Sequence, residues 1–367
     1  MTLQAIDPLT APALERVAAD DLVQATMRWH FDQETGSPFW LQRARSLGFD
    51  PIHDVRSAAD LALFPDVAPE WQTLPAEDLI PRGCRAGEWA FMVFESGGTT
   101  GAPKRVIEMQ SRRRAAGWVS YVLDQHGFPG TGEGHWLHIG PSGPHLVGRT
   151  VGVLAHLRRS LCYYIDFDPR WVKRCLREGR RDEVTRYVDH VIDQALAVLD
   201  TQPVGVIFAT PAILESVCSQ PRVLETFQRR ARGLIWSGTS MSDETLRLLD
   251  QEFFPDARVV GLYGNTMLGI APQRPAHSGD AEQCVFQPFH PYCLMEVVDP
   301  DEPSRHVAYG APGQVRASLL TRELFLPRTL ERDLVVRVAP TAAYPWDGVA
   351  RVRPLPSLRN EVVEGVY

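Results

Sequence analysis

Residues 96–104 read Ser-Gly-Gly-Thr-Thr-Gly-Ala-Pro-Lys, a combination of residue types that can hold a phosphate group. Glycines allow the backbone to approach an anion closely and to point N–H groups at it. The serine and the two threonines add hydroxyl donors, and Lys104 adds a positive charge. The segment is not a Walker loop, because Arg105 stands where that motif has Ser or Thr after its lysine. We therefore predict a phosphate cradle, with a glycine-rich surface turn as the structural alternative.

The elements around this segment predict an α/β fold. Short apolar runs indicate strands, and apolar residues at helical spacing indicate helices. Strands are predicted over 89–94 (buried), 204–209, 233–237 and 259–263, and helices over 11–30, 38–48, 109–126, 170–200 (one long helix), from Pro211, and from the N-cap Ser242 to 251. Strands that alternate with helices indicate a mainly parallel sheet, which binds its ligand at the carboxyl ends of the strands.

The pattern changes after residue 283 to short strands between Pro, Gly and Asp turns, over 293–298, 313–318 and 333–338. This change predicts a small β-rich subdomain that follows the α/β part. The expected regions are a helical and irregular N-terminal part (1–85), an α/β nucleotide-binding core (86–282), the β-rich subdomain (283–350) and a tail (351–367).

Composition narrows the class of partner. The 367 residues are 44% hydrophobic and 23% charged, with a net charge of -7 and no basic block, which argues against a nucleic-acid partner. No run of about 18 apolar residues predicts a membrane span, and the N-terminus does not resemble a signal peptide. Six scattered cysteines are typical of reduced thiols, so a cytoplasmic protein is expected, with a homodimer as one possible assembly.

Residues 96–104 resemble the phosphate loop of the adenylate-forming superfamily, which includes acyl-CoA synthetases, peptide-synthetase adenylation domains and firefly luciferase. Four further motifs resemble this family in the same order along the chain. They are the small-residue loop at the adenine (236–239), the Tyr-Gly-x-Thr motif (263–266), the turn at 310–314, and the ribose-binding aspartate, Asp333. The ordered set is more specific than any single motif. The resemblance implies the large N-terminal domain of this fold, with mainly parallel sheets and a small β-barrel-like subdomain, and ATP and Mg²⁺ as cofactors.

The resemblance also implies which residues bind and react. The implied ATP- and AMP-binding residues are Ser96, Gly97, Gly98, Thr99, Thr100, Gly101, Lys104, Ser237, Gly238, Thr239, Tyr263, Gly264, Asn265, Thr266 and Asp333. The implied catalytic residues are Lys104, Thr266 and His145, and the implied substrate-binding residues are His145, Ala209 and Gly261. A structural alternative for His145 is a loop histidine with a backbone partner.

The chain departs from the family at three places. Met267 stands where the family has a glutamate that holds Mg²⁺, and a thioether is a poor ligand for that hard cation. Residues 344–347, Tyr-Pro-Trp-Asp, lack the arginine expected before the hinge. The sequence ends soon after the hinge-like residues 347–351, so the C-terminal lid domain and its lysine are expected to be absent.

The N-terminal part, with residues 35–40 and the Pro-rich stretch to Arg82, resembles the phenylacetate-CoA ligase branch. Short members of the family act in phenazine (griseoluteic acid) biosynthesis or as acyl-protein synthetases of bioluminescence. The latter use a cysteine near the C-terminus, whereas the last cysteine here is Cys293, which favours the former.

The expected function is ATP-dependent activation of a small aromatic carboxylic acid as an acyl-adenylate with release of pyrophosphate. A downstream reductase or transferase is a possible protein partner. The alternatives are nitrite activation for diazotisation, an acyl-protein synthetase, and a non-catalytic protein that binds a nucleotide or an aryl acid.

Two weaker patterns remain. Cys284, His290 and Cys293, with His277, have a spacing that allows a zinc site, but buried thiols and a capping histidine are the simpler interpretation, and no metal site is predicted. Residues 112–114, three arginines, are interpreted as a solvated helix face, with contact to the leaving phosphates as the alternative.

Overall fold

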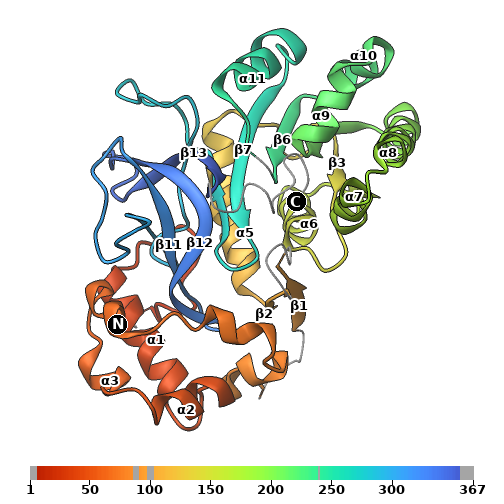
Figure 1. Ribbon diagram of the computed structural model, residues 1–367. Coiled ribbons are helices and arrows are strands. Elements are labelled where there is room, and N and C mark those ends of the chain that lie inside the picture. Colours follow the sequence, from red (N-terminus) through yellow and green to blue (C-terminus); the bar gives the residue numbers. More distant parts are fainter. Residues whose placement is uncertain (1–5, 86–90, 97–102, 239, 356–367) are drawn as a thin grey trace.

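The computed structural model describes residues 6–85, 91–96, 103–238 and 240–355, and these ranges contain two large β-sheets and one two-stranded ribbon (Figure 1). The larger sheet has the strand order β4-β3-β5-β6-β7-β8, and all neighbours are parallel except β7 and β8. Its strands are β3 (His135–Gly140), β4 (Cys162–Asp166), β5 (Val204–Ala209), β6 (Gly233–Ser237), β7 (Arg258–Asn265) and β8 (Gly269–Pro272). This is the mainly parallel sheet that the sequence predicts.

Helices cover both faces of this sheet. The helices are α5 (Ser111–Gln125), α6 (Leu146–Leu157), α7 (Pro169–Arg177), α8 (Arg181–Thr201), α9 (Pro211–Cys218), α10 (Pro221–Arg230) and α11 (Asp243–Leu248), followed by the π-helical turn η4 (Leu249–Phe253). Apolar residues of α5 and α6 pack on one face of β3, β5, β6 and β7, whereas those of α7 to α11 pack on the other. Strands buried on both faces are nearly continuous in apolar residues, which is why their sequences are easily recognised.

A second, antiparallel sheet has the order β10-β11-β12-β13-β9 and lies beside the parallel one (Figure 1). Its strands are β9 (Val285–Phe286), β10 (Cys293–Val298), β11 (Pro312–Leu320), β12 (Phe325–Val338) and β13 (Gly348–Pro354). Register shifts within β11, β12 and β13 mark bulges, which bend a strand and increase its twist. The sheet curves into a half-barrel as a result, and the long strand β12 reaches the carboxyl edge of the parallel sheet.

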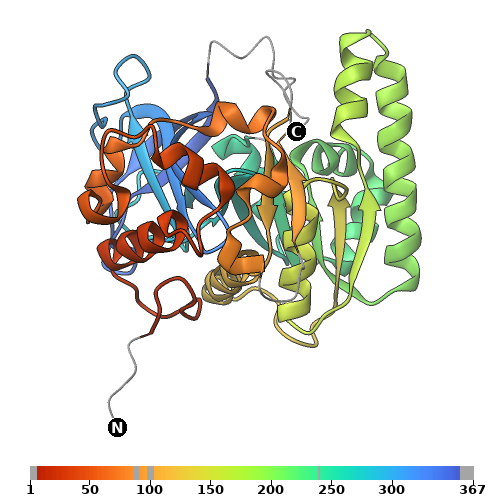
Figure 2. The same cartoon turned by 90° about the horizontal axis from the view of Figure 1, so that it is seen from below.

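The N-terminal part is helical and packs against the antiparallel sheet (Figure 2). Its elements are α1 (Ala19–Phe31), α2 (Pro38–Ala44), α3 (Pro51–Asp54), η1 (Ala58–Leu63), η2 (Ala68–Gln72), η3 (Ala76–Leu79) and α4 (Arg82–Arg85). Buried rings of Phe31, Trp40 and Phe64 surround Phe325 of β12, and the Trp40 indole donates to the Phe325 carbonyl over 3.1 Å. This contact holds the start of β12 in place.

The structure corrects two predicted elements. The strand at 89–94 is β1 (Met92–Glu95), which pairs with β2 (Arg105–Glu108) in a two-stranded ribbon and exposes Met92 and Val93, so it is not the buried strand expected. The single helix predicted at 170–200 is two helices, because Gly179 adopts a left-handed conformation (φ 75°) that ends α7. In the ranges that the structure describes, no helix combines the length and the apolar character that crossing a membrane requires.

Candidate active site

A cavity of about 910 Å³ opens at the carboxyl ends of the parallel strands. Residues that follow four of these strands line it, namely His145 after β3, Pro211 after β5, Gly238 after β6 and Thr266 after β7. The opposite wall comes from β12, with Asp333. A volume of this size is typical of sites for small molecules and cofactors. The cavity therefore lies where the sequence predicts a ligand site, between the two sheets.

Two hydrogen bonds cross from β7 to β12 at the cavity wall. The Tyr263 hydroxyl donates to Oδ2 of Asp333 over 2.8 Å, and Nδ2 of Asn265 donates to Oε2 of Glu331 over 2.8 Å. Alternate residues of a strand share a face, which is why 263 and 265 can face 331 and 333. The Asn265 side-chain oxygen also accepts the N–H groups of the two residues at 267 and 268, so it orients the turn after β7.

The tight turn after β7 depends on Gly264. A Cβ atom at this position would lie 2.0 Å from the carbonyl oxygen of Gly269 in β8. No side chain fits there without moving the backbone, so the close pairing of β7 and β8 requires glycine. This pairing fixes where the residues at 263, 265 and 266 meet the cavity.

Two carboxyl groups of β12 line the cavity, those of Glu331 and Asp333, and both have raised pKa values. Burial raises the pKa of Asp333, and the Tyr263 hydrogen bond opposes this change. Burial, together with the charge of Asp333, raises the pKa of Glu331 to about 7, although Lys104 lies near enough to oppose this shift. One oxygen of Glu331, Oε1, is buried and has no hydrogen-bond partner within the described residues. Glu331 therefore presents unused acceptor capacity beside the cavity.

The two ends of the segment predicted to bind phosphate are held together. The N–H of Ser96 donates to the Lys104 carbonyl and the N–H of Lys104 donates to Oγ of Ser96, each over 2.9 Å. Ser96 and Lys104 both line the cavity, and so do Ser237, Gly238, Tyr263, Gly264, Asn265, Thr266, Asp333 and His145. The predicted residues Gly97, Gly98, Thr99, Thr100, Gly101 and Thr239 lie outside the described residues.

Glu95 connects this segment to the rest of the cavity wall. Its carbonyl accepts from the Thr266 hydroxyl (3.1 Å), its N–H donates to the carbonyl of Pro144 (3.0 Å), and its carboxylate accepts from Arg170 (2.8 Å) and Arg105 (3.1 Å). The hydrogen bond from Arg170, followed by that from Arg105, lowers the pKa of Glu95, so this carboxyl is ionised at neutral pH. The end of β1, the loop before α6, α7 and the end of β7 thus meet at one residue.

His145 and Lys173 lie on the wall formed by α6 and α7. Burial, followed by the positive charge of Arg170, lowers the pKa of His145, so its imidazole is neutral at pH 7. Lys173 is 9% exposed. Sequence reasoning did not identify Lys173, Glu331 or Glu95 as site residues. The scarcity of lysine in the chain is the signal that could have pointed to Lys173.

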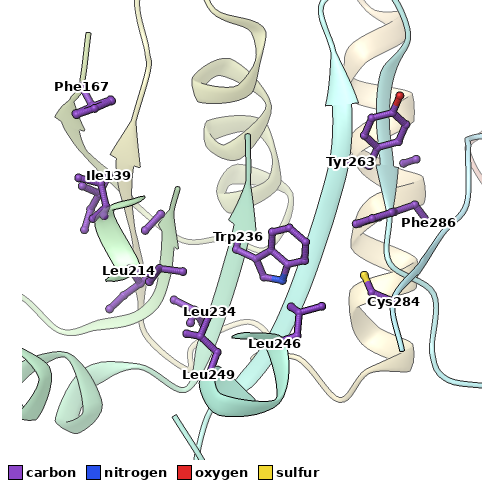
Figure 3. Packing of buried hydrophobic residues seen from close by; sticks show 14 of the residues in the cluster. Ile139, Phe167, Leu214, Leu234, Trp236, Leu246, Leu249, Tyr263, Cys284 and Phe286 are labelled. Atoms are coloured by element: carbon purple, nitrogen blue, oxygen red, sulfur yellow. The ribbon is translucent and has the colours of Figure 1, made fainter. Parts of the chain in front are cut away.

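Part of the cavity lining is apolar. The lining residues that belong to the main hydrophobic cluster include Leu214, Trp236, Leu246, Leu249, Cys284 and Phe286. Figure 3 shows this cluster, in which the Tyr263 hydroxyl points away from Phe286 and Cys284. The polar wall with Asp333 and this apolar lining belong to the same cavity. Two residues predicted to bind the substrate, Ala209 and Gly261, are not among the residues that line it.

The structure revises the weaker sequence patterns. Met267 is 3% exposed and packs in the N-terminal hydrophobic cluster, although it also borders the cavity. Arg112 is buried and pairs with Glu108, and Arg114 donates to the Leu9 carbonyl (2.6 Å), so this is not a solvated helix face, and neither side chain lines the cavity.

The zinc alternative has no geometric support. Within the described part of the chain, no group of three or more His, Cys, Asp or Glu side chains is arranged to hold a metal ion. His290 instead stacks on Trp346, with ring centroids 4.9 Å apart, and Cys284 and Cys293 are buried in the core.

No protein-family model matches this sequence, and neither does any curated protein. Solved structures of 2-hydroxyisobutyryl-CoA ligase are similar. The complex with 2-HIB-AMP and CoA in the thioesterification state has a TM-score of 0.68 at 17% identity, covering 94% of this chain and 69% of the ligase. The postadenylation state with R3-HIB-AMP has a TM-score of 0.66 at 15% identity, covering 95% and 70%. The chain therefore has the fold of the large N-terminal domain of adenylate-forming enzymes, a helix-flanked parallel sheet joined to an antiparallel half-barrel.

Proposed function

We propose that this protein uses ATP to activate a carboxylic acid as an acyl-adenylate. A carboxylate oxygen attacks the α-phosphorus, a new C–O–P linkage forms, and the bond from the α-phosphorus to the bridging oxygen breaks. Pyrophosphate leaves with that electron pair. The observation that carries the proposal is the single cavity that joins Lys104 and Thr266 with Asp333 at one end and an apolar chamber at the other.

The nucleotide would lie along the polar wall. Asp333 would accept hydrogen bonds from the ribose hydroxyls, and Tyr263 fixes the orientation of its carboxylate. The Thr266 hydroxyl would turn from the Glu95 carbonyl to the α-phosphate, and Ser237 and Gly238 would border the adenine. Lys104 and the segment it closes would hold the β- and γ-phosphates. A preorganised donor at such a site contributes about 10²–10³ in rate.

Glu331 is a carboxyl group at the cavity that fits Mg²⁺. This cation prefers oxygen ligands and keeps phosphate oxygens and water in its coordination shell. Glu331, with a buried oxygen that has no partner in the described part of the chain, could supply the oxygen that Met267 cannot. When bound, the ion would neutralise charge on the phosphates, and the protein's own contribution would be to position and orient the nucleotide.

The acid would place its apolar part in the chamber around Trp236 and Phe286 and its carboxylate near His145. Flat walls from these rings suit an aromatic acid. The sequence resemblance to the phenylacetate-CoA ligase branch supports the same class, with phenazine-type antibiotic biosynthesis as the setting it suggests. A downstream reductase or transferase would then consume the adenylate.

Pyrophosphate exchange tests this proposal. Purified protein is incubated with ATP, Mg²⁺ and labelled pyrophosphate, together with benzoate, 4-hydroxybenzoate, salicylate, phenylacetate or 2-hydroxyisobutyrate, and label incorporated into ATP is measured. Exchange that depends on one acid and falls at least tenfold in Lys104→Met is expected. ATP binding by calorimetry without exchange for any acid would instead favour a non-catalytic nucleotide-binding protein.

A further inference from the structure

The chain contains only two lysines, Lys104 and Lys173, among its 38 Lys and Arg residues. All the other residues in this count are arginines. Both lysines line the same cavity, although one precedes β2 and the other lies on α7. A lysine ammonium is a compact charge whose protonation responds to burial, whereas an arginine guanidinium stays charged. Because the two lysines of the chain both lie at this cavity, Lys173, like Lys104, stands out as a position where a lysine amine contributes to ligand binding.

Lys173 has no anion of its own. Its side-chain amine makes no hydrogen bond or ion pair to any residue in the described part of the chain, although the residue is only 9% exposed. The charged groups that influence it are Arg332 of β12 and Arg170 and Arg177 of α7, all of them cations. Burial, followed by these charges, lowers the pKa of Lys173 to about 8. Burying an ammonium group without a counter-ion lowers the stability of the folded protein. The presence of Lys173 is therefore explained by the binding of an anionic ligand rather than by a gain in stability.

The surroundings of Lys173 are suited to an anion. His145, whose pKa is lowered partly by the charge of Lys173, lies on the same wall and has no hydrogen bond from its imidazole within the described residues. The next residues, Leu146 and Val147, begin the 12-residue helix α6, whose N-terminus has no side-chain cap and lines the cavity. Uncapped N–H groups at a helix N-terminus favour negative charge. Lysine, imidazole and helix N-terminus therefore surround one part of the cavity.

We propose that Lys173 binds the carboxylate of the acid substrate, while Lys104 serves the phosphates. This inference rests on the proposed function and specifies one subsite of the same cavity. The carboxylate is the group that fits, because the acid's apolar part would fill the apolar chamber, whose lining includes Leu214, Trp236 and Phe286, in the same cavity that Lys173 lines. Lys173 would align the carboxylate for its attack and would offset the repulsion between two anions.

The first test separates the two lysines by kinetics. Lys173→Met keeps the length of the side chain and removes its charge. Its KM for the acid that supports exchange should rise about tenfold or more, with the KM for ATP unchanged within about twofold. Lys104→Met is the matched control and should show the opposite pattern. Lys173→Arg, which keeps a positive charge, should recover part of the loss. Equal KM values for the acid in Lys173→Met and the wild type would overturn the inference.

The second test needs no turnover. Reductive ¹³C-methylation gives NMR signals for two lysines and the N-terminal amine, and Lys173→Arg assigns the signal of Lys173. We expect this amine to titrate near pH 8 and its pKa to rise when the exchanging acid is added, but not with the corresponding primary amide. Lys173→Met should fold with a melting temperature at or above that of the wild type, since it removes a buried charge.

The outcomes distinguish the two proposals. No exchange with any acid in the wild type removes the proposed function and this subsite with it. Exchange with an acid that leaves both the Lys173 signal and the KM of Lys173→Met unchanged removes the subsite alone. A rise in both KM values in Lys173→Met would mean that the residue supports the fold of the wall rather than binding the carboxylate.

Discussion

Tyr263 donates its phenolic hydrogen to Asp333 over 2.8 Å and so joins the parallel sheet to the antiparallel one. Tyr263 is buried and Asp333 is half-buried at the cavity wall, where loss of solvation raises the pKa of Asp333. Tyr263→Phe removes a donor from a buried carboxylate, which should lower the free energy of unfolding by about 1–3 kcal/mol. Urea denaturation at pH 8 measures this loss.

The chain offers a matched control in Tyr309, whose hydroxyl donates to Asp347 over 3.1 Å on the surface. Tyr309 is 53% exposed, so water can replace the lost bond. Tyr309→Phe should therefore change the free energy of unfolding by no more than about 0.5 kcal/mol. Equal losses in the two variants would show that burial of the Tyr263–Asp333 bond has no special effect.

Asp333→Asn tests ribose recognition. If the carboxylate accepts the ribose hydroxyls, its loss should weaken ATP binding about 10–100-fold, the range for hydrogen bonds to a charged group. Binding of 2′,3′-dideoxy-ATP should change far less, because that nucleotide lacks both hydroxyls. Calorimetry with both nucleotides gives the comparison. A parallel loss for the two would show that the aspartate acts elsewhere in the cavity.

Glu331 should make stability depend on pH. The pKa of its carboxyl is raised from 4.5 to about 7 in the folded protein. Between these values the folded state retains a proton that the unfolded chain releases, so stability falls as the pH rises from 4.5 to 7. Glu331→Gln removes this fall. The variant should match the wild type near pH 4.5 and be more stable at pH 8 by roughly 3 kcal/mol. Glu34→Gln, on the surface, should leave the profile unchanged.

The same variant tests the proposed role of Glu331 toward the metal. Titration with Mn²⁺ in the presence of ATP, followed by electron paramagnetic resonance, reports the affinity for a divalent cation. Glu331→Gln should weaken this affinity about tenfold. An unchanged affinity would mean that phosphate oxygens and water suffice. The pH profile of stability would then remain as a separate property of the buried carboxyl.

Arg112 and Glu108 form a buried pair away from the cavity, with exposed fractions of 5% and 8%. Arg112→Met leaves the Glu108 carboxylate buried without its cation, which should cost about 3–5 kcal/mol of folding free energy. The neighbouring Arg113 is exposed, and Arg113→Met should change stability by about 0.5 kcal/mol at most. Chemical denaturation of both variants makes the comparison. Similar values would contradict a structural role for the buried pair.

Local patterns in the sequence were sufficient for much of the fold. The strand predicted at 293–298 has the same limits in the structure, and α9 begins at Pro211 as expected. Ser242 caps α11 by accepting from the N–H of Thr245 over 3.1 Å. These features depend on residues close together in the chain. The helix predicted at 170–200 shows the limit of periodicity, since the one residue that breaks it, Gly179, does so through its left-handed backbone.

Features that depend on distant segments were not predictable. Glu331 stands in an ordinary strand pattern, and its hydrogen-bond partner Asn265 is 66 positions earlier in the sequence, so its buried surroundings come from distant segments. Arg112 stands in a run of three arginines that resembles a solvated face, and only the position of Glu108 beside it shows that it is buried. The motifs predicted which strand ends would meet at the site. The burial of charged residues such as Glu331 and Arg112 could be seen only in the three-dimensional structure.

Glu95 gives the cavity a mechanical property. Through its backbone and its carboxylate it holds the end of β7, the loop before α6, and α7 at one point. A phosphate that draws the Thr266 hydroxyl away would leave the Glu95 carbonyl without this donor, while Pro144 and Arg170 would still hold Glu95 beside the wall that carries Lys173. Phosphate binding at Thr266 is therefore expected to change the hydrogen bonding of the same residue that anchors α7, the helix that carries Lys173.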